Sequence, residues 1–439
     1  MALASGPMRS PQLTGRLRIS QPTLSRAIVN LGRDAVRIRV GRTFQYALRD
    51  GARGIEDCPV YRVDEGGRIS QIGTLIPVRN DGFVMCETSG PTLFSEGIPW
   101  WLLDMRPQGY MGRAYAARHA QALGLPTNIR EWSDSQSIRA LIAHGHDATG
   151  NLLLGDLARA RFLHSPDPVA VPLQARGEHY TRLARQVAGD DEPWSSAAGE
   201  QPKFAVYSES LLGCRHRIVK FTQPDENPVT QRWRDLLLAE HHALETLAQG
   251  GVAAARTEII DYGGQRFLEV ERFDRIGMRG RMGLFSLGAV DAEFTGMAKS
   301  VWPVVAKELA TLGHIQPDAS DGTALLYAFG TLIGNTDMHE GNLSFVSHSG
   351  RPYALAPAYD MLPMAFQPRS GGGLSNTLSP ATLHATVALE VWQSAMVLAI
   401  NFLERIRSDS RFSEQFAPCL ENLSLHVQDA QKRIARLGN

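Results

Sequence analysis

A short polar segment between apolar runs is the feature that most constrains how this chain can fold. Residues 334–342 read Gly-Asn-Thr-Asp-Met-His-Glu-Gly-Asn and directly follow the apolar run 324–333. A run of that length predicts a buried helix, and the shorter apolar runs at 343–346 and 353–360 predict two strands of a hairpin that turns at 347–350. The polar segment is therefore expected on a loop between buried elements, where functional side chains are often carried.

Two carboxylates and an amide in this region follow the order that phosphoryl transfer requires. Asp337 can orient the attacking hydroxyl and accept its proton, and Asn342, five residues later, can supply an amide oxygen to Mg²⁺. Asp360, after the hairpin, can hold the metal against the phosphates. The alternative is a solvated loop in which Asp337 caps a turn and His339 is incidental. The second carboxylate and the apolar flanks favour phosphoryl transfer, provided that a nucleotide lobe lies upstream.

A lysine and a glutamate upstream predict such a lobe. Lys220 stands in the middle of an apolar strand, where a buried ammonium requires an anionic partner. The predicted helix 231–248 carries Glu240 on its apolar face, so that Glu240 can steady Lys220 against the phosphates. The alternative is a solvated glutamate on the shoulder of a helix and a lysine that extends to solvent.

The segments on either side of this pair complete the predicted lobe. Residues 195–203 are small and flexible and precede an apolar strand at 204–207, so their backbone N–H groups can approach phosphates. A surface loop of similar composition is the alternative. Residues 267–275 are expected to form a strand that leaves the lobe, and its backbone is a candidate hinge for an adenine ring.

The N-terminal fifty residues differ from the rest of the chain in charge. The formal net charge is zero, but this segment has nine Arg and two Asp, which is 9 − 2 = +7 and leaves −7 for the remainder. Short helices are expected from Ser10 as an N-cap and from Ser20 or Gln21, the second ending at Gly32 with Leu24, Ile28 and Leu31 on its apolar face. Alternation at 35–40 and 43–48 predicts a two-stranded wing.

This segment resembles winged helix-turn-helix DNA-binding domains, especially in Ser-Gln-Pro-Thr-Leu-Ser-Arg at 20–26. Side chains off the apolar face of the second helix can reach base edges and phosphates in a major groove, and the wing exposes arginines. The alternative is a helical dimerisation module, and the local charge favours DNA. The candidate DNA-binding residues are Gln21, Thr23, Ser25, Arg26, Arg37, Arg39 and Arg42.

Residues 51–180 show no convincing catalytic set. Strands are expected at 60–63 and 68–73, helices from about Met111 and Ser135, and a proline-rich linker near 166–172. Widely spaced cysteines, the absence of an apolar leader and the lack of an apolar run of membrane-spanning length predict a cytoplasmic protein without a membrane partner. The cysteines are Cys58, Cys86, Cys214 and Cys419.

In combination and in order, these motifs resemble the HipA family of serine/threonine kinases, which are toxins of bacterial toxin–antitoxin systems. The matching segments are Ser-Ala-Ala-Gly-Glu-Gln-Pro-Lys at 196–203, Ile-Val-Lys-Phe around Lys220, Val-Glu-Arg-Phe-Asp-Arg at 270–275, the loop 334–342 and Pro-Ala-Tyr-Asp ending at Asp360. With the helix-turn-helix, the chain is most similar to the YjjJ-like subgroup.

The resemblance implies an ATP- and Mg²⁺-dependent kinase of α+β fold, with a two-lobed protein-kinase-like core and an N-terminal winged helix-turn-helix. It also implies autophosphorylation of Ser196, a protein substrate such as the glutamate-tRNA ligase targeted in the family, and a HipB-like antitoxin. The expected division is 1–50 for DNA binding, 51–180 for a HipA N-terminal-like subdomain, 181–275 for the nucleotide lobe and 276–439 for the helical catalytic lobe.

Each candidate site residue has an expected role. Asp337 is the base, Asn342 and Asp360 hold Mg²⁺, and His339 supports the loop beside the nucleotide. The other nucleotide-binding candidates are Ser196, Ala197, Ala198, Gly199, Gln201, Lys203 and Lys220 for the phosphates, and Glu271 and Phe273 for the adenine. Two other functions remain open: a DNA-binding regulator whose kinase-like domain is a nucleotide sensor or pseudokinase, and a metal-dependent nuclease.

Overall fold

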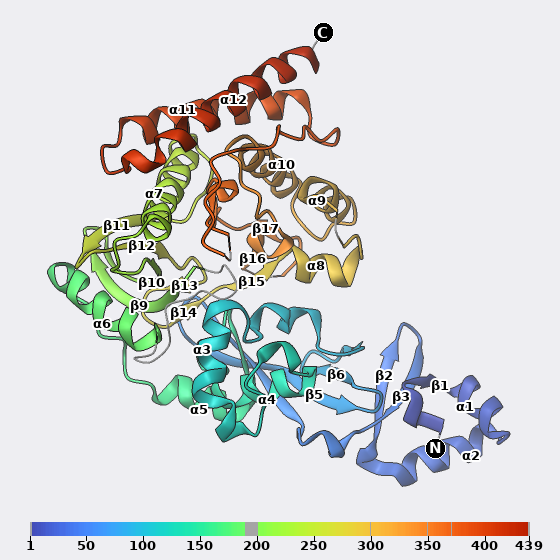
Figure 1. Cartoon of the computed structure of the whole chain (residues 1–439). Coiled ribbons are helices and arrows are strands. Elements are labelled where there is room, and N and C mark those ends of the chain that lie inside the picture. The colour runs from blue at the N-terminus through green and yellow to red at the C-terminus, as the bar shows by residue number, and fades with distance from the viewer. Residues whose placement is uncertain (1, 189–200, 299, 349, 370, 438–439) are drawn as a thin grey trace. The chain divides into compact units, whose positions relative to one another are not determined.

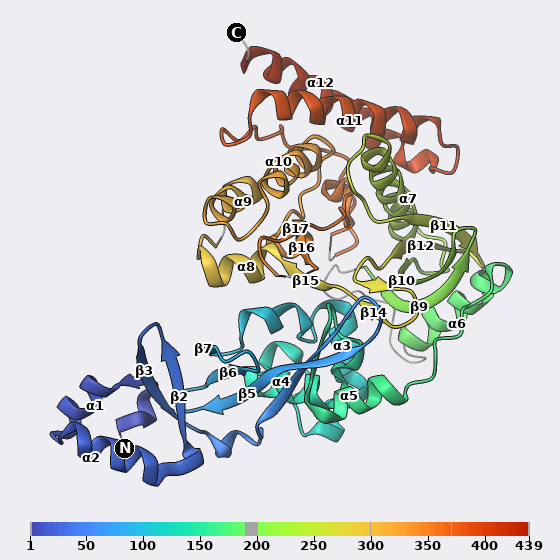
Figure 2. The same ribbon diagram turned by 180° about the vertical axis from the view of Figure 1, so that it is seen from behind.

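The computed structural model describes residues 2–188, 201–298, 300–348, 350–369 and 371–437 (Figures 1 and 2). The chain divides into two compact units, Met1–Gln108 with Gly112–Pro166 and Gly109–Met111 with Asp167–Asn439. Both units contain helices and strands. The finer division into four parts stays a prediction. Among the described residues, no helix combines the length and the apolar character that crossing a membrane requires.

The N-terminal part of the first unit forms two helices and a hairpin at the predicted positions. Ser20 is the N-cap of the second helix and accepts a hydrogen bond from the Thr23 backbone N–H at 3.4 Å, and Gly32, with φ +53°, ends the helix. These elements are α1 (Ser10–Leu17), α2 (Gln21–Leu31), β2 (Ala35–Val40) and β3 (Thr43–Leu48).

Three details of this part differ from the expectation. The N-cap of α1 is Arg9 and not Ser10, and β1 (Met8–Arg9) adds a third strand beside β3. A strand of two residues has no alternating pattern that a sequence could reveal. Leu24 is 3% exposed, but Leu31 is 40% exposed. The reason is that the small core of this part centres on Leu3, Leu13 and Leu24, and the last turn of α2 extends beyond it.

A five-stranded antiparallel sheet forms the rest of the first unit, in the order β7-β6-β5-β4-β8. Val36 and Ile38 of the N-terminal hairpin pack with Ile76, Val78 and Val84 of this sheet, so the two parts share a core. The elements are β4 (Cys58–Val63), β5 (Ile69–Val78), β6 (Gly82–Glu87), β7 (Thr92–Ser95), α3 (Gly109–His119), α4 (Asp134–His144), β8 (Leu152–Leu154) and α5 (Gly155–His164).

The second unit begins with a four-stranded sheet between two helices (Figures 1 and 2). Alternate side chains of the sheet face opposite sides: Val219 and Phe221 pack with Tyr180 of α6, whereas Leu268 packs with Leu237 of α7. The strand order is β11-β12-β10-β9, and the elements are α6 (Arg176–Ala188), β9 (Lys203–Ser210), β10 (Gly213–Phe221), α7 (Pro228–Gln249), β11 (Thr257–Tyr262) and β12 (Gln265–Glu271).

The remainder of the second unit is mainly helical. Helix α10 contains the predicted buried run, and β16 and β17 form the predicted hairpin, which β15 extends to three strands. The elements are β13 (Arg275–Ile276), β14 (Gly280–Arg281), β15 (Gly283–Ser286), α8 (Leu287–Phe294), α9 (Trp302–Thr311), α10 (Pro317–Leu332), β16 (Ser344–Ser347), β17 (Ala354–Leu355), α11 (Leu389–Ser408) and α12 (Ala417–Leu437).

A buried ion-pair network joins α6 to the sheet. Glu269 of β12 is 1% exposed and accepts hydrogen bonds from Arg176 at 2.9 Å and from the Tyr180 hydroxyl, and its carboxylate lies 3.1 Å from Arg217 Nε. Burial raises the pKa of Glu269, and the Tyr180 hydroxyl and the two guanidinium groups oppose that shift. Arg176 also pairs with Glu258, whose side chain is 46% exposed.

This network gives a prediction about stability. Glu269→Ala leaves two buried guanidinium groups without their shared carboxylate, and we expect it to lower the free energy of unfolding by about 3–5 kcal/mol. Glu258→Ala is the matched control, because it removes a solvent-exposed partner of the same arginine and should cost less than about 1 kcal/mol. Urea unfolding followed by circular dichroism measures both, and equal losses would contradict the assignment.

Candidate active site

A buried lysine lies between two carboxylates from distant parts of the second unit. Lys220 of β10 is 7% exposed, and its Nζ donates to Glu240 Oε1 at 2.6 Å and to Oε2 at 2.7 Å. The same ammonium donates to Asp360 Oδ1. Glu240, on α7, is fully buried, and the Asp360 side chain is 29% exposed. The strand and helix predicted to bring Lys220 and Glu240 together therefore do so.

The charges of this cluster stabilise one another. Burial alone disfavours the charged forms of all three groups. The two carboxylates nevertheless raise the pKa of Lys220, and Lys220, with Lys203 assisting, lowers the pKa of Asp360 to about 2 in spite of burial. Burial raises the pKa of Glu240, with the Lys220 charge opposing it. Asp360 is thus an ionised carboxylate at neutral pH, in the state that a metal ligand requires.

The loop after α10 is held by its own side chains. The Asp337 backbone N–H donates to Asn335 Oδ1 at 3.0 Å, and Asn342 Nδ2 donates to the Asp337 carbonyl at 2.8 Å. His339 Nδ1 accepts from the Gly341 backbone N–H at 3.0 Å. Trp302 of α9 donates from its indole to the His339 carbonyl at 3.2 Å. Asp337 and Asn342 remain partly exposed, whereas these hydrogen bonds fix the backbone of the loop.

Side chains also join this loop to the segment that carries Asp360. Asn335, 4% exposed, donates from Nδ2 to the Asp360 carbonyl at 3.4 Å. The Tyr359 hydroxyl donates to the Gly341 carbonyl at 2.8 Å and lies 2.6 Å from Ser344 Oγ. Asp360 itself has φ +51°, an unusual conformation for a residue with a side chain, and such strain is often concentrated at functional sites.

Close packing under α10 brings the two segments together. A Cβ at Gly330 would lie 2.5 Å from Met338 Sδ and 3.2 Å from Met361 Sδ, so a larger residue would force both methionine side chains to shift. Glycine in the middle of a helix otherwise lowers stability, and its use here follows from this close approach. The helix, the loop and the Asp360 segment therefore form one packed arrangement.

Comparison with known proteins identifies the family. A model described as "YjjJ-like toxin, middle domain" matches residues 55–163, and one described as "HipA-like C-terminal domain" matches residues 195–429. The chain is 36% identical to "Toxin YjjJ" of Escherichia coli (strain K12) over 438 residues, which cover 99% of this chain and 98% of that protein. The chain belongs to the HipA-like toxin family.

A solved structure of the HipA-like family shares the fold. This is HipA of Shewanella oneidensis MR-1 from its toxin–antitoxin complex with HipB and operator DNA. The TM-score is 0.55 at 17% sequence identity, and the match covers 87% of this chain and 97% of that chain. The predicted HipA-like fold, with mixed helices and strands, is therefore confirmed.

The structure describes some of the predicted phosphate-binding residues of this HipA-like chain. Ser196, Ala197, Ala198 and Gly199 lie outside the described residues. Just after them, Gln201 donates from Nε2 to the Phe221 carbonyl at the end of β10. Lys203 stands directly opposite Lys220 in the pairing of β9 with β10. Two lysines therefore lie side by side where β9 begins and β10 ends.

The expected adenine and metal residues have the following surroundings. Glu271 ends β12 and donates its backbone N–H to the Arg256 carbonyl at 2.8 Å, and the Phe273 ring lies 5.8 Å from the Tyr359 ring. Magnesium prefers oxygen ligands such as carboxylates and amides. Asp360 and Asn342 offer one of each, and the bond from Asn342 Nδ2 to Asp337 directs its amide nitrogen inward and leaves Oδ1 for a metal. The donor set therefore fits Mg²⁺.

The candidate DNA-binding residues lie in the first unit, on α2 and the β2–β3 hairpin. All seven are exposed, and they are Gln21, Thr23, Ser25, Arg26, Arg37, Arg39 and Arg42. The Thr23 hydroxyl lies 2.9 Å from that of Ser20, and the Arg37 guanidinium lies 3.4 Å from the centroid of the Phe44 ring. Arg39 and Arg42 extend further along the same hairpin.

Sequence reasoning missed the residues that brace the site. Asn335 and Tyr359 were read as part of motifs, but their bonds between the two loops depend on the packing of α10, which spacing does not reveal. Trp302 had no sequence signal, because it reaches His339 from another helix. Only Asn335 offered a sequence signal, because it stands two residues after the apolar run 324–333 and two residues before Asp337.

The Lys220 cluster predicts an unusual dependence of stability on pH. Lys220→Met leaves the buried Glu240 and the partly exposed Asp360 near each other without a cation, and we expect a loss of about 3–5 kcal/mol at pH 7. Burial and Asp360 then raise the pKa of Glu240 above its unfolded value, so the folded variant binds more protons than the unfolded chain. Its stability should therefore rise as the pH falls from 7 toward 5.

Chemical unfolding of the variant at several pH values tests this expectation. Lys307→Met is the matched control, since it removes an exposed lysine of α9 and leaves the Lys220 cluster intact. A Lys220→Met variant whose stability falls on acidification in parallel with the wild type and with this control would show that Lys220 does not compensate the two carboxylates.

Proposed function

We propose that this protein is a HipA-like serine/threonine protein kinase toxin that transfers the γ-phosphate of ATP to a protein hydroxyl. The observation that carries the proposal is the buried Lys220 bonded to both Glu240 and Asp360, with the Asp360 segment tied to the loop of Asp337. Phosphoryl transfer depends mainly on positioning and on charge stabilisation, and this arrangement offers both.

Each side chain has a role in the proposed reaction. Lys220, held by Glu240, binds the α- and β-phosphates, and Lys203 adds a second positive charge beside it. Asp337 orients the acceptor hydroxyl and accepts its proton. Asp360 and Asn342 hold Mg²⁺, which supplies charge neutralisation when bound. His339 keeps the loop in shape through its bond with Gly341.

Further residues of the second unit complete the proposed nucleotide contacts. We propose that Glu271 and the ring of Phe273, which packs beside Tyr359, contact the adenine. Gln201 supports the residues that contact the phosphates. We propose that Ser196, Ala197, Ala198 and Gly199 contact the phosphates, and that Ser196 is the site of autophosphorylation.

DNA binding is a second proposed activity, located in the first unit. Two helices and a hairpin with exposed arginines, in a segment of +7 charge, support a winged helix-turn-helix that contacts a major groove. The Shewanella HipA was solved with HipB and operator DNA. We propose that this chain contacts DNA through its own N-terminal segment, with a HipB-like antitoxin as a further partner and an aminoacyl-tRNA ligase as a candidate substrate in the cytoplasm.

Two rival functions make different predictions. A nucleotide sensor or pseudokinase would bind ATP and leave no phosphate on any protein. The ionised Asp360 and the intact Lys220–Glu240 pair favour a working site over a dead one. A nuclease that uses Asp337 and Asp360 would cleave DNA in the absence of ATP, because hydrolysis of DNA by a metal has no need for an ATP-binding lysine.

The kinase proposal predicts a specific loss of activity. Asp337→Asn removes the group that accepts the hydroxyl proton, and we expect phosphate transfer from γ-labelled ATP to fall by about 10²–10⁴-fold. Asp318→Asn, an exposed aspartate at the start of α10, is the control and should transfer phosphate at the wild-type rate. Wild-type protein that binds ATP and Mg²⁺ but labels neither itself nor any protein of a cell extract would refute the kinase.

The DNA proposal predicts a change in salt dependence. Each phosphate contact that is lost should reduce the slope of log affinity against log salt by roughly one, so the double variant Arg39→Ala/Arg42→Ala should reduce it by about two. Arg68→Ala removes an exposed arginine of the same unit outside the N-terminal segment and is the control. Fluorescence anisotropy with duplex DNA over a salt series measures the slope, and identical slopes for all three proteins would contradict the assignment.

A further inference from the structure

Helix α7 carries polar groups on the face opposite Glu240. At about 100° per residue, Asp235 and His242 lie roughly 200–220° around the helix from Glu240 and about two turns from each other. Both are buried, with Asp235 1% exposed and His242 8% exposed. Glu240 contacts Lys220 on one side of the helix, and the other side needs polar partners of its own.

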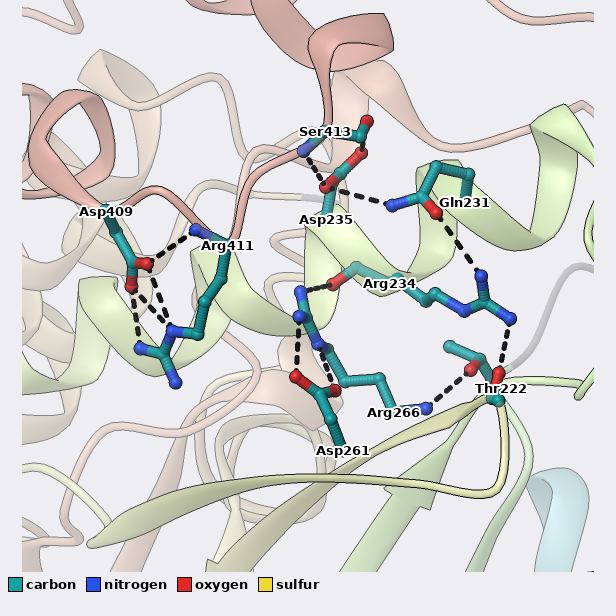
Figure 3. Close-up of polar contacts among 10 residues, drawn as sticks. Thr222, Gln231, Arg234, Asp235, Asp261, Arg266, Asp409, Arg411 and Ser413 are labelled. Atoms are coloured by element: carbon teal, nitrogen blue, oxygen red, sulfur yellow. Dashed lines mark hydrogen bonds and ion pairs between the residues drawn. The ribbon is translucent and has the colours of Figure 1, made fainter.

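These partners come from the short connection between α11 and α12. Asp235 Oδ1 accepts from the Ser413 backbone N–H at 3.0 Å, and Oδ2 accepts from the Ser413 hydroxyl at 2.6 Å (Figure 3). His242 Nε2 lies 2.7 Å from Asp409 Oδ2. Residues 409–413, which we call the 409–413 connection, therefore bind two successive parts of α7 through the side chains of Asp235 and His242.

The 409–413 connection is itself tightly bonded. Arg411 donates its backbone N–H to Asp409 Oδ1 at 2.9 Å and its side chain to the same carboxylate at 2.6–3.1 Å, as Figure 3 shows. The Phe412 ring stacks on His242 with centroids 5.9 Å apart and on Phe416 at 5.4 Å. A segment held in this way resists a shift of α7 along or around its axis.

The sheet side of α7 has a separate anchor. Arg266 of β12 donates to the Arg234 carbonyl at 3.3 Å, and two bonds to Asp261 hold the Arg266 guanidinium (Figure 3). This anchor lies near the N-terminal half of the helix. It holds that half against the sheet, while Asp235 and His242 bind the opposite face of the helix to the 409–413 connection.

We propose that the 409–413 connection is a strut that sets the position of α7 and thereby keeps Glu240 in contact with Lys220. Asp235, His242, Asp409 and Ser413 are then positioning residues for phosphate transfer, acting through Glu240. This consequence for activity rests on the proposed kinase function. The bonds of 2.6 and 2.7 Å between Lys220 and Glu240 would be lost with a displacement of about 1 Å, and a rigid helix transmits such a displacement.

The imidazole of His242 allows a conservative replacement. Burial lowers the pKa of His242, and the hydrogen bond and charge of Asp409 oppose this shift. A neutral imidazole donates through Nε2–H, which the amide of a glutamine can imitate in roughly the same place. His242→Gln should therefore restore the bond to Asp409, whereas His242→Ala removes both the bond and the stacking with Phe412.

The test is a double-mutant cycle on the full chain with γ-labelled ATP as the probe. We expect His242→Ala to lower kcat by about tenfold or more, with a smaller change in the KM for ATP, and His242→Gln to recover most of the loss. In a Glu240→Gln background, His242→Ala should lower kcat by less than about twofold further, because His242 acts through Glu240. Ser413→Ala, which removes one hydroxyl, should change kcat in the same direction and by less.

Ile434→Ala is the matched control for general destabilisation. Ile434 is a buried residue of α12, 4% exposed, and its truncation should leave kcat unchanged in the folded protein. Equal losses of kcat in His242→Ala and Ile434→Ala, or full additivity of His242→Ala with Glu240→Gln, would overturn the strut.

Hydrogen exchange separates the strut from the kinase function. In His242→Ala, the amides of residues 236–244 and those around Lys220 should exchange faster than in Ile434→Ala. If the wild type transfers no phosphate, the kinase proposal fails and this comparison alone decides on the strut: faster exchange confined to His242→Ala supports it, and equal exchange overturns it.

Discussion

The need to compensate one buried ammonium determines much of the second unit. Lys220 lies within an apolar strand, where an isolated charge would cost several kcal/mol, and two carboxylates lie beside it. One comes from α7 and the other from the segment after the β16–β17 hairpin, more than a hundred residues later in the chain. The sheet, the helix and the Asp360 segment are therefore held to one another by charge as well as by apolar packing.

A second set of hydrogen bonds holds the candidate reactive groups near this cluster. Asn335 joins the loop of Asp337 to the Asp360 carbonyl, and Tyr359 joins the Asp360 segment to Gly341. These bonds are made largely to backbone atoms, so they fix the course of both segments and leave the Asp337 and Asn342 side chains available. On the far side, α7 is held by the 409–413 connection. In the proposed kinase, a site built in this way would be organised before a nucleotide binds, which would reduce the cost of ordering it during the reaction.

Much of this arrangement could be predicted from the sequence where local pattern and chemistry agree. The lysine in an apolar strand, the glutamate on an apolar helix face and the hairpin before Asp360 each carried a local signal. The bracing by Trp302, Asn335 and the 409–413 connection could not be predicted, since it depends on which helices pack together. Strand β1 was missed because two residues show no alternating pattern, and the exposure of Leu31 was missed because the extent of the small core around Leu24 is a property of the fold.

The fold of the first unit explains how the N-terminal segment exposes its positive charge. Val36 and Ile38 of the N-terminal hairpin are buried against Ile76 and Val84, so the basic segment shares its core with the sheet that follows it. An arginine-rich hairpin with no hydrophobic support would be too small to fold alone. Packing against the sheet holds its inner face, and the alternation of β2 then turns Arg37 and Arg39 to solvent. The same period-two pattern that buries the valine and isoleucine therefore also exposes the arginines.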